Sequence, residues 1–123
     1  MTRFMLLLHE STTGAEGLAP GEIQAIIARY SAWADKLMAE GKHAGGEKLA
    51  DDGGGRHLVG AGASLQMTDG PYAEAKEVIG GFFAIHAADY DEACRIAESC
   101  PHLEYGGRIE VRQFDELATC AAE

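Results

Sequence analysis

Two side chains of the sequence carry groups suited to moving a proton, and both stand where a strand is expected to end. His9 follows a run of apolar residues, and an imidazole titrates close to neutral pH. Asp69 precedes Gly70 and Pro71, and a carboxylate at a strand end can act as a general base or bind a cationic group. The pair predicts acid–base chemistry. The alternative stays open that Asp69 only closes a turn and that His9 is a hydrogen-bonded residue at the rim of a cavity.

Charged residues suited to holding a substrate occur at two further places. Glu74, Lys76 and Glu77 form a compact set after the turn, which either orients a substrate or is a solvated connector. Arg108 and Arg112 share one face of the last expected strand and have the geometry to grip an anionic group, Arg108 being the candidate. Charges on that strand equally protect a sheet edge against aggregation.

Motifs for metals and cofactors are missing from the sequence. Residues 52–56 are rich in glycine but lack the Lys-Ser/Thr ending of a phosphate loop, and no dinucleotide fingerprint is present. The remaining histidines have no metal-ligand spacing, so we expect neither a metal nor a cofactor. These histidines are His43, His57, His86 and His102.

The three cysteines, Cys94, Cys100 and Cys120, are odd in number and have no CxxC spacing. They indicate reduced thiols of a cytoplasmic protein. We expect Cys94 and Cys100 to be small core residues on the inner stripe of a helix rather than nucleophiles.

Length and charge narrow the class of protein. The chain has 123 residues, enough for one domain, with 20 acidic residues against 10 basic ones and a formal net charge of −10. So acidic a surface disfavours nucleic acids and anionic membranes as partners. No segment approaches the ~20 apolar residues of a membrane helix, and the apolar run at residues 4–8 is short for a signal-peptide core. We therefore expect a cytoplasmic protein.

The hydrophobic pattern predicts the elements that must position these groups. Continuous apolar segments indicate strands buried on both faces, and apolar residues at steps of three and four indicate helices. The expected order is β-α-β-hairpin-β-α-β. Strands are expected at residues 3–10, 42–49, 78–87 and 108–114, a hairpin at 56–68, and helices from Pro20 to a Gly41 cap and from an Asp89 cap to Pro101.

This order predicts an α+β fold, the ferredoxin-like split β-α-β sandwich with an added hairpin. The first and third main strands are apolar on both faces and belong at the centre of the sheet. In the last strand, Ile109 and Val111 alternate with Arg108, Glu110 and Arg112, as expected of an edge strand. The domain is expected to span residues 3–114, followed by a C-terminal tail at 115–123.

Two helices cover only one face of such a sheet. Met5 and Leu7 point away from the side of Phe4, Leu6 and Leu8, so one of the two sets lacks a helix to pack on. Exposing that much apolar sheet is costly. We expect a homodimer in which a second copy covers the open face.

Three segments carry a family resemblance. MTDGPYAEAKEVIGGF (residues 67–82), GRIEVR (107–112) and FMLLL (4–8) resemble the signature of the YCII-related family, in the branch named after its Asp-Gly-Pro-Phe motif. The resemblance implies a dimeric α+β barrel, with a suspected His-Asp centre in some branches and a frequent association of this branch with extracytoplasmic-function sigma factors. Tyr72 stands where the branch usually has phenylalanine, and its hydroxyl would alter a substrate pocket.

Three functions remain open at this stage. The first is cofactor-free proton transfer, such as isomerisation or elimination, on a small organic molecule, with His9 and Asp69 as acid and base and Tyr72, Glu74, Lys76 and Arg108 binding the substrate. The second is a non-catalytic accessory protein that binds a ligand or a sigma factor. The third is a structural dimer without a pocket.

Overall fold

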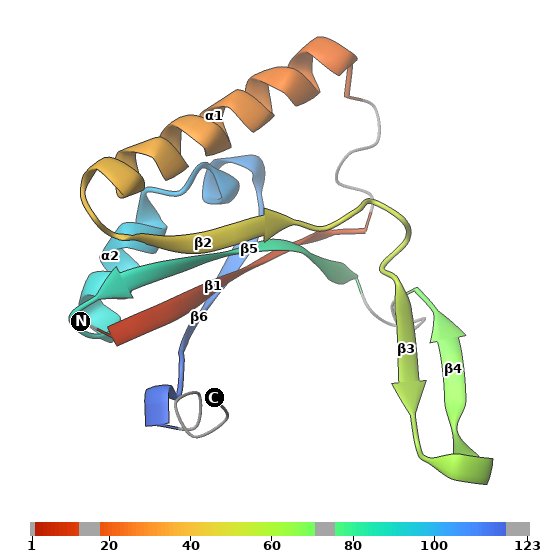
Figure 1. Cartoon of the computed structure of the whole chain (residues 1–123). Helices are drawn as coiled ribbons and strands as arrows, with labels where there is room; N and C mark the ends of the chain where they lie inside the picture. The colour runs from red at the N-terminus through yellow and green to blue at the C-terminus, as the bar shows by residue number, and fades with distance from the viewer. Residues whose placement is uncertain (1, 13–17, 71–75, 118–123) are drawn as a thin grey trace.

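A computed structural model describes residues 2–12, 18–70 and 76–117. Two helices lie on one face of a four-stranded antiparallel sheet, and a separate two-stranded hairpin projects from it (Figure 1). The sheet strands are β1 (Thr2–Ser11), β2 (His43–Lys48), β5 (Glu77–Ala87) and β6 (Arg108–Gln113). The other elements are the helices α1 (Pro20–Ala39) and α2 (Tyr90–Glu98), the hairpin strands β3 (Arg56–Val59) and β4 (Gln66–Asp69), and the 3-10 turns η1 (Gly62–Ser64) and η2 (Pro101–Tyr105).

The strand order of the sheet is β2-β5-β1-β6. The two apolar strands β1 and β5 are central and antiparallel, and the charged strand β6 pairs with β1 at the edge of the sheet. This arrangement confirms the predicted ferredoxin-like fold. It follows from the side-chain pattern, because strands that are apolar on both faces are most stable at the centre of a sheet, where other strands flank them and their faces can be buried.

The core lies between the sheet and the helices. In β1 the side chains alternate, so Phe4 and Leu6 point to the helices and are 1% and 0% exposed. From α1, Trp33 packs edge-to-face on Phe83 of β5 with ring centroids 5.0 Å apart. From α2, the contribution is Ile96 and two small residues. The buried cluster comprises Phe4, Leu6, Trp33, Leu37, Ile85, Ala87, Ala93, Ile96, Ala97 and Cys100.

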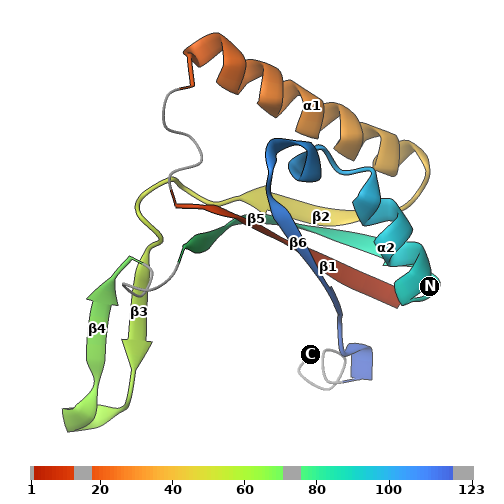
Figure 2. The ribbon, with the colours of Figure 1, turned by 180° about the vertical axis from the view of Figure 1, so that it is seen from behind.

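The predicted apolar stripe of α1 is only partly buried. Trp33 and Leu37 are buried, but Ile23 and Ile27 are 38% and 55% exposed. Both views of the ribbon show α1 rising away from the sheet toward its N-terminal end (Figures 1 and 2). The periodicity therefore predicted the helix correctly but overestimated how much of its stripe reaches the core.

The predicted caps set the limits of α2. The Asp89 carboxylate accepts a hydrogen bond from the Glu92 amide at 2.9 Å, while the Glu92 carboxylate accepts from the Ala88 amide at 3.0 Å. Pro101 opens η2, which ends the helix at Glu98 as expected. No helix in the described part of the chain has both the length and the apolar character needed to cross a bilayer.

The hairpin is confirmed, with a tip longer than its glycines predicted. Leu58 of β3 pairs with Met67 of β4, and η1 forms the tip. Both views show the hairpin projecting from the sheet at the end where β1 finishes and β5 begins (Figures 1 and 2). Leu58 and Met67 are 58% and 55% exposed in the single chain.

The second face of the sheet carries neither helix, as the two views show (Figures 1 and 2). We call it the open face. It is formed by alternate residues of the strands, including Met5 and Leu7 of β1 and Phe82 and Ala84 of β5, which pair across the two strands. Met5, Leu7 and Phe82 are only partly buried. The mismatch between apolar sheet and helical cover is thus present in the structure.

Candidate functional site

His9 lies on the open face near the end of β1. It is in register with Arg108 of β6 on one side and with Ile79 of β5 on the other. The β1–β5 register shifts between Leu8 and His9, which leaves Gly80 as the extra residue of the predicted bulge. A Cβ atom at Gly80 would lie 1.8 Å from a Glu10 carboxylate oxygen, so a larger residue here would displace the Glu10 side chain.

The partner of His9 is Glu110 of β6. The Nε2 atom of His9 and the Oε1 atom of Glu110 are 2.9 Å apart, and the His9 side chain is 14% exposed. Hydrogen bonds from His9 and then Arg112 lower the pKa of the Glu110 carboxyl. A carboxylate only accepts hydrogen bonds, so the Nε2 atom of His9 carries the hydrogen. In the neutral ring, Nδ1 is therefore the basic nitrogen.

Arg108 and Arg112 flank Glu110 on the open face of β6, and each pairs with a carboxylate. Arg108 crosses to β5, where its Nε and Nη2 atoms donate to one oxygen of Glu77 at 3.1 and 3.0 Å. Arg112 lies 3.3 Å from the second oxygen of Glu110. The open face of β6 is thus a row of alternating charges beside His9, as its sequence pattern predicted.

Asp69, the other predicted acid–base residue, ends β4 at the base of the hairpin. Its carboxylate is 90% exposed and pairs with Arg56 across the hairpin at 3.4 Å. It borders an open cavity of about 700 Å³, which Asp52 and Gly70 also line. The hairpin base lies at the same end of the sheet as the end of β1 (Figures 1 and 2). Within the described part of the chain, however, the carboxylate bonded to His9 is that of Glu110.

The remaining predicted site residues lie around the same chain segment. Lys76 is exposed, and its backbone carbonyl accepts a hydrogen bond from the Thr12 amide at 3.3 Å. Glu77 begins β5 and binds Arg108. Tyr72 and Glu74 lie outside the described residues.

A buried histidine, which the sequence reasoning did not single out, holds the backbone of this site. His102 of η2 is 5% exposed; its Nε2 lies 2.7 Å from the carbonyl oxygen of His9, and its Nδ1 lies 2.8 Å from the hydroxyl of Tyr30. The carbonyl only accepts, so Nε2 donates. Burial raises the pKa of the Tyr30 phenol, so its hydroxyl keeps a hydrogen that it can donate to Nδ1 when the ring is neutral.

Gly107 is the residue whose type could have indicated the buried position of His102 from the sequence. A Cβ atom at Gly107 would lie 2.1 Å from the His102 ring. The glycine pair before β6 therefore includes one residue that makes room for a buried side chain.

The described residues also contain potential metal ligands and two cysteines. Across residues 2–12, 18–70 and 76–117, no group of histidine, cysteine and acidic side chains is arranged to hold a metal ion. Cys100 is a core residue as predicted, and burial raises the pKa of its thiol to about 11. The same expectation for Cys94 is wrong: it is exposed, because it lies on the outer side of α2 beside the buried Ala93.

The sequence matches the model of one protein family over most of its length. The model of the YCII-related domain matches residues 2–116. The chain belongs to the YCII-related family. No curated protein matches this YCII-related chain. Among solved structures, it is similar to 5-chloro-2-hydroxyhydroquinone dehydrochlorinase from Burkholderia phenoliruptrix AC1100, determined in complex with 2,5-dihydroxybenzoquinone, with 22% identity and a TM-score of 0.46 over 91% of this chain and 93% of that one.

Proposed function

We propose that this YCII-related protein binds a small organic molecule on the open sheet face and exchanges a proton with it through His9. The hydrogen bond between His9 and Glu110 carries the proposal. It joins an imidazole to an ionised carboxylate on a surface that the helices leave uncovered. No cofactor is required for such a step, because the imidazole itself takes up and returns the proton.

In this proposal each nitrogen of His9 has its own role. Glu110 fixes Nε2 as the donor, orients the ring and stabilises the imidazolium that forms when Nδ1 takes a proton from the substrate. Return of that proton to another atom of the substrate gives an isomerisation, and loss of a leaving group gives an elimination. Arg108 and Arg112 stand beside the ring and favour a substrate that carries or develops negative charge.

We further propose that the site is closed by a second copy of the chain. Met5, Leu7 and Phe82 form an apolar surface next to the charged row of β6. Covering it would remove water from His9 and strengthen its interaction with Glu110. The exposed Leu58 and Met67 of the hairpin add apolar surface outside the sheet.

Residues at the base of the hairpin would form the other side of the site. Asp69 stands at the hairpin base and Lys76 directly before β5, at the end of the sheet that His9 approaches. With Tyr72 and Glu74 they would line the substrate pocket, and the DGPF-type signature of residues 69–72 would belong to that wall. Asp69 would serve as the second acid or base, opposite His9.

A ligand screen tests the proposal. We expect small carboxylates and phenols to include compounds that raise the melting temperature of the wild type but not of His9→Asn, with Asp69→Asn weakened and His43→Asn, on the edge strand β2, unaffected. Compounds that bind should exchange a carbon-bound hydrogen in deuterated water, as followed by NMR, only when His9 and Glu110 are both present. Hits that stabilise His9→Asn as strongly as the wild type would contradict the proposal. Co-purification with a sigma factor and no ligand would instead favour the accessory role.

A further inference from the structure

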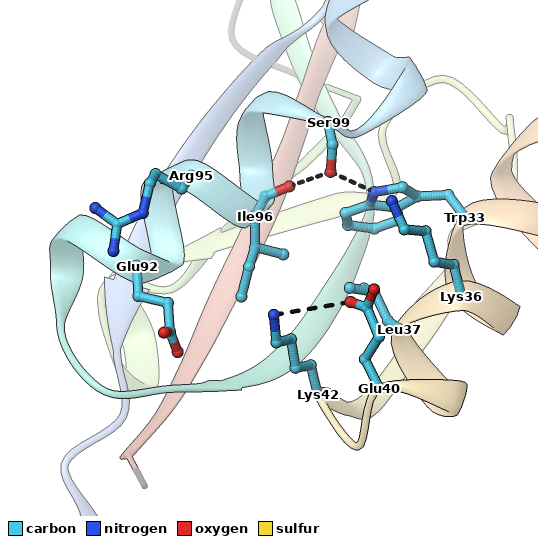
Figure 3. A pocket seen from close by; sticks show the side chains of 9 residues that line it. All are labelled: Trp33, Lys36, Leu37, Glu40, Lys42, Glu92, Arg95, Ile96 and Ser99. Atoms are coloured by element: carbon cyan, nitrogen blue, oxygen red, sulfur yellow. Dashed lines mark hydrogen bonds and ion pairs between the residues drawn. The ribbon is translucent and has the colours of Figure 1, made fainter.

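A second cavity lies on the other side of the molecule, between the two helices. Its volume is about 350 Å³, at the lower end of the range of small-molecule sites. Trp33, Leu37 and Ile96 provide its apolar lining. Figure 3 shows these side chains with Lys36 coming from α1, Lys42 from the turn after α1, and Arg95 from α2. The sheet separates this cavity from the open face.

Positive charge is concentrated at this cavity. Lys36, Lys42 and Arg95 are three of the ten basic residues of a chain whose net charge is −10. In the described part of the chain, no carboxylate lies within ion-pair distance of Lys36 or Arg95. Lys42 has only a long contact of 3.7 Å with Glu40.

The acidic residue of α2 at the cavity takes part in the cap of that helix. Glu92 accepts a hydrogen bond from the Ala88 amide in the cap of α2. This neutral donor leaves the charge of Glu92 in place, so the lining has three cations and two carboxylates, Glu40 and Glu92. The net positive charge of the lining favours an anion.

The polar atoms of the lining bind one another. Trp33 donates from Nε1 to the Ser99 hydroxyl at 2.8 Å, and that hydroxyl donates to the Ile96 carbonyl at 2.7 Å (Figure 3). The indole and the hydroxyl thus make their hydrogen bonds inside the protein, and Trp33, Leu37 and Ile96 present a small apolar surface between the charged side chains. An apolar floor with excess cations at its rim fits a carboxylate attached to a small apolar body.

We propose that this cavity binds a small organic carboxylate, with its charge facing Lys36, Lys42 and Arg95 and its apolar body resting on Trp33, Leu37 and Ile96. The site is independent of the proposed chemistry at His9. Its ligand class is set by the combination of charge and apolar floor, since an inorganic anion would use only the first and a neutral molecule only the second.

The fluorescence of Trp33 provides a direct test, because it is the single tryptophan of the chain. The probes are benzoate and hexanoate, with benzyl alcohol and hexanol as neutral analogues and inorganic phosphate as the purely anionic one. We expect a saturable change with the two carboxylates that weakens at high salt, and weaker responses to the other three probes. Lys36→Gln and Arg95→Gln should each weaken carboxylate binding by about tenfold.

Lys48→Gln is the matched control, since Lys48 is an exposed lysine of β2 that pairs with Asp51 away from the cavity. It should bind like the wild type, and circular dichroism should show all three variants folded. Equal binding by Lys36→Gln, Arg95→Gln and the wild type would overturn the proposal. So would responses to the alcohols or to phosphate as strong as those to the carboxylates, or the absence of saturation.

Discussion

Leu6 and Leu7 are neighbours in β1, but they lie on the two faces of one sheet and have different surroundings. Leu6 is 0% exposed beneath the helices, whereas Leu7 is partly exposed on the open face and pairs with Phe82 and Glu110. The covered face has the tightly packed apolar core. The open face carries both apolar residues and the charged set around His9. The difference indicates that the covered face determines the stability of the fold, while the open face carries the proposed chemistry.

Replacing each leucine by alanine should reveal the largest difference in stability between the two faces. Leu6→Ala should lower the free energy of unfolding by about 2–5 kcal/mol, because it leaves a cavity in the core. Leu7→Ala should cost less in the isolated chain, because its side chain is already partly hydrated. Urea denaturation followed by circular dichroism measures both.

The two variants should also differ in how their loss of stability depends on protein concentration. If a second copy covers the open face, the deficit of Leu7→Ala relative to the wild type should grow with concentration, because the wild type gains stability from assembly. The deficit of Leu6→Ala should not. Equal losses for the two variants at every concentration would remove the distinction between the faces.

The contact between Gly107 and His102 tests the link from the core to the site. Gly107→Ala should lower the free energy of unfolding by about 1–3 kcal/mol, because the new methyl group overlaps the His102 ring. Adding His102→Ala should recover part of this loss, which a thermal melt of the double variant would show. Gly21→Ala, where nothing lies within 4 Å of the new Cβ, should not destabilise. A harmless Gly107→Ala would contradict the close packing.

Removing the Tyr30 hydroxyl should have a smaller effect. Tyr30→Phe leaves Nδ1 of the buried His102 without its hydrogen-bond partner, so we expect a loss of about 1 kcal/mol in unfolding free energy. The position of the ring that holds the His9 carbonyl should loosen, which NMR of the His9 amide would detect. An unchanged His9 signal would indicate that the two histidines are not coupled.

Acidification should reveal the smallest effect, that of Glu110 on the open face. Its pKa is lowered in the fold by His9 and Arg112, so the stability that it contributes is present above the ordinary carboxyl value of 4.5 and is lost as pH falls below it. Glu110→Gln should therefore melt slightly below the wild type at neutral pH and converge with it in acid. A gap between their melting temperatures that widens in acid would be the opposite of this expectation.

The sequence predicted the fold well because the fold depends on local patterns. The alternation in β1, the apolar run of β5 and the Asp89 cap each determine one element, and the element order leaves few topologies. The extent to which each helix is buried was harder to predict. Ile27 belongs to the stripe of α1 but stays exposed, since the tilt of a helix on its sheet is set by tertiary packing.

The site was predicted less completely because it depends on register and on contacts distant in sequence. His9 was identified, but its bond to Glu110 follows from the pairing of β1 with β6, where Leu7 faces Glu110 and His9 faces Arg108. No local pattern determines that offset. The role of His102 likewise depends on η2 folding back onto β1, for which Gly107 was the available signal.

The most direct test of the account is sedimentation velocity of the wild type and Leu7→Glu at micromolar concentration. We expect a wild-type species of twice the 13.1 kDa chain mass, and a folded Leu7→Glu variant at the mass of a single chain, because the added charge would lie in the interface between the two copies. A wild type that sediments as a single chain at every concentration would contradict the claim that a second copy closes the open face. A Leu7→Glu variant that dimerises as well as the wild type would contradict it equally.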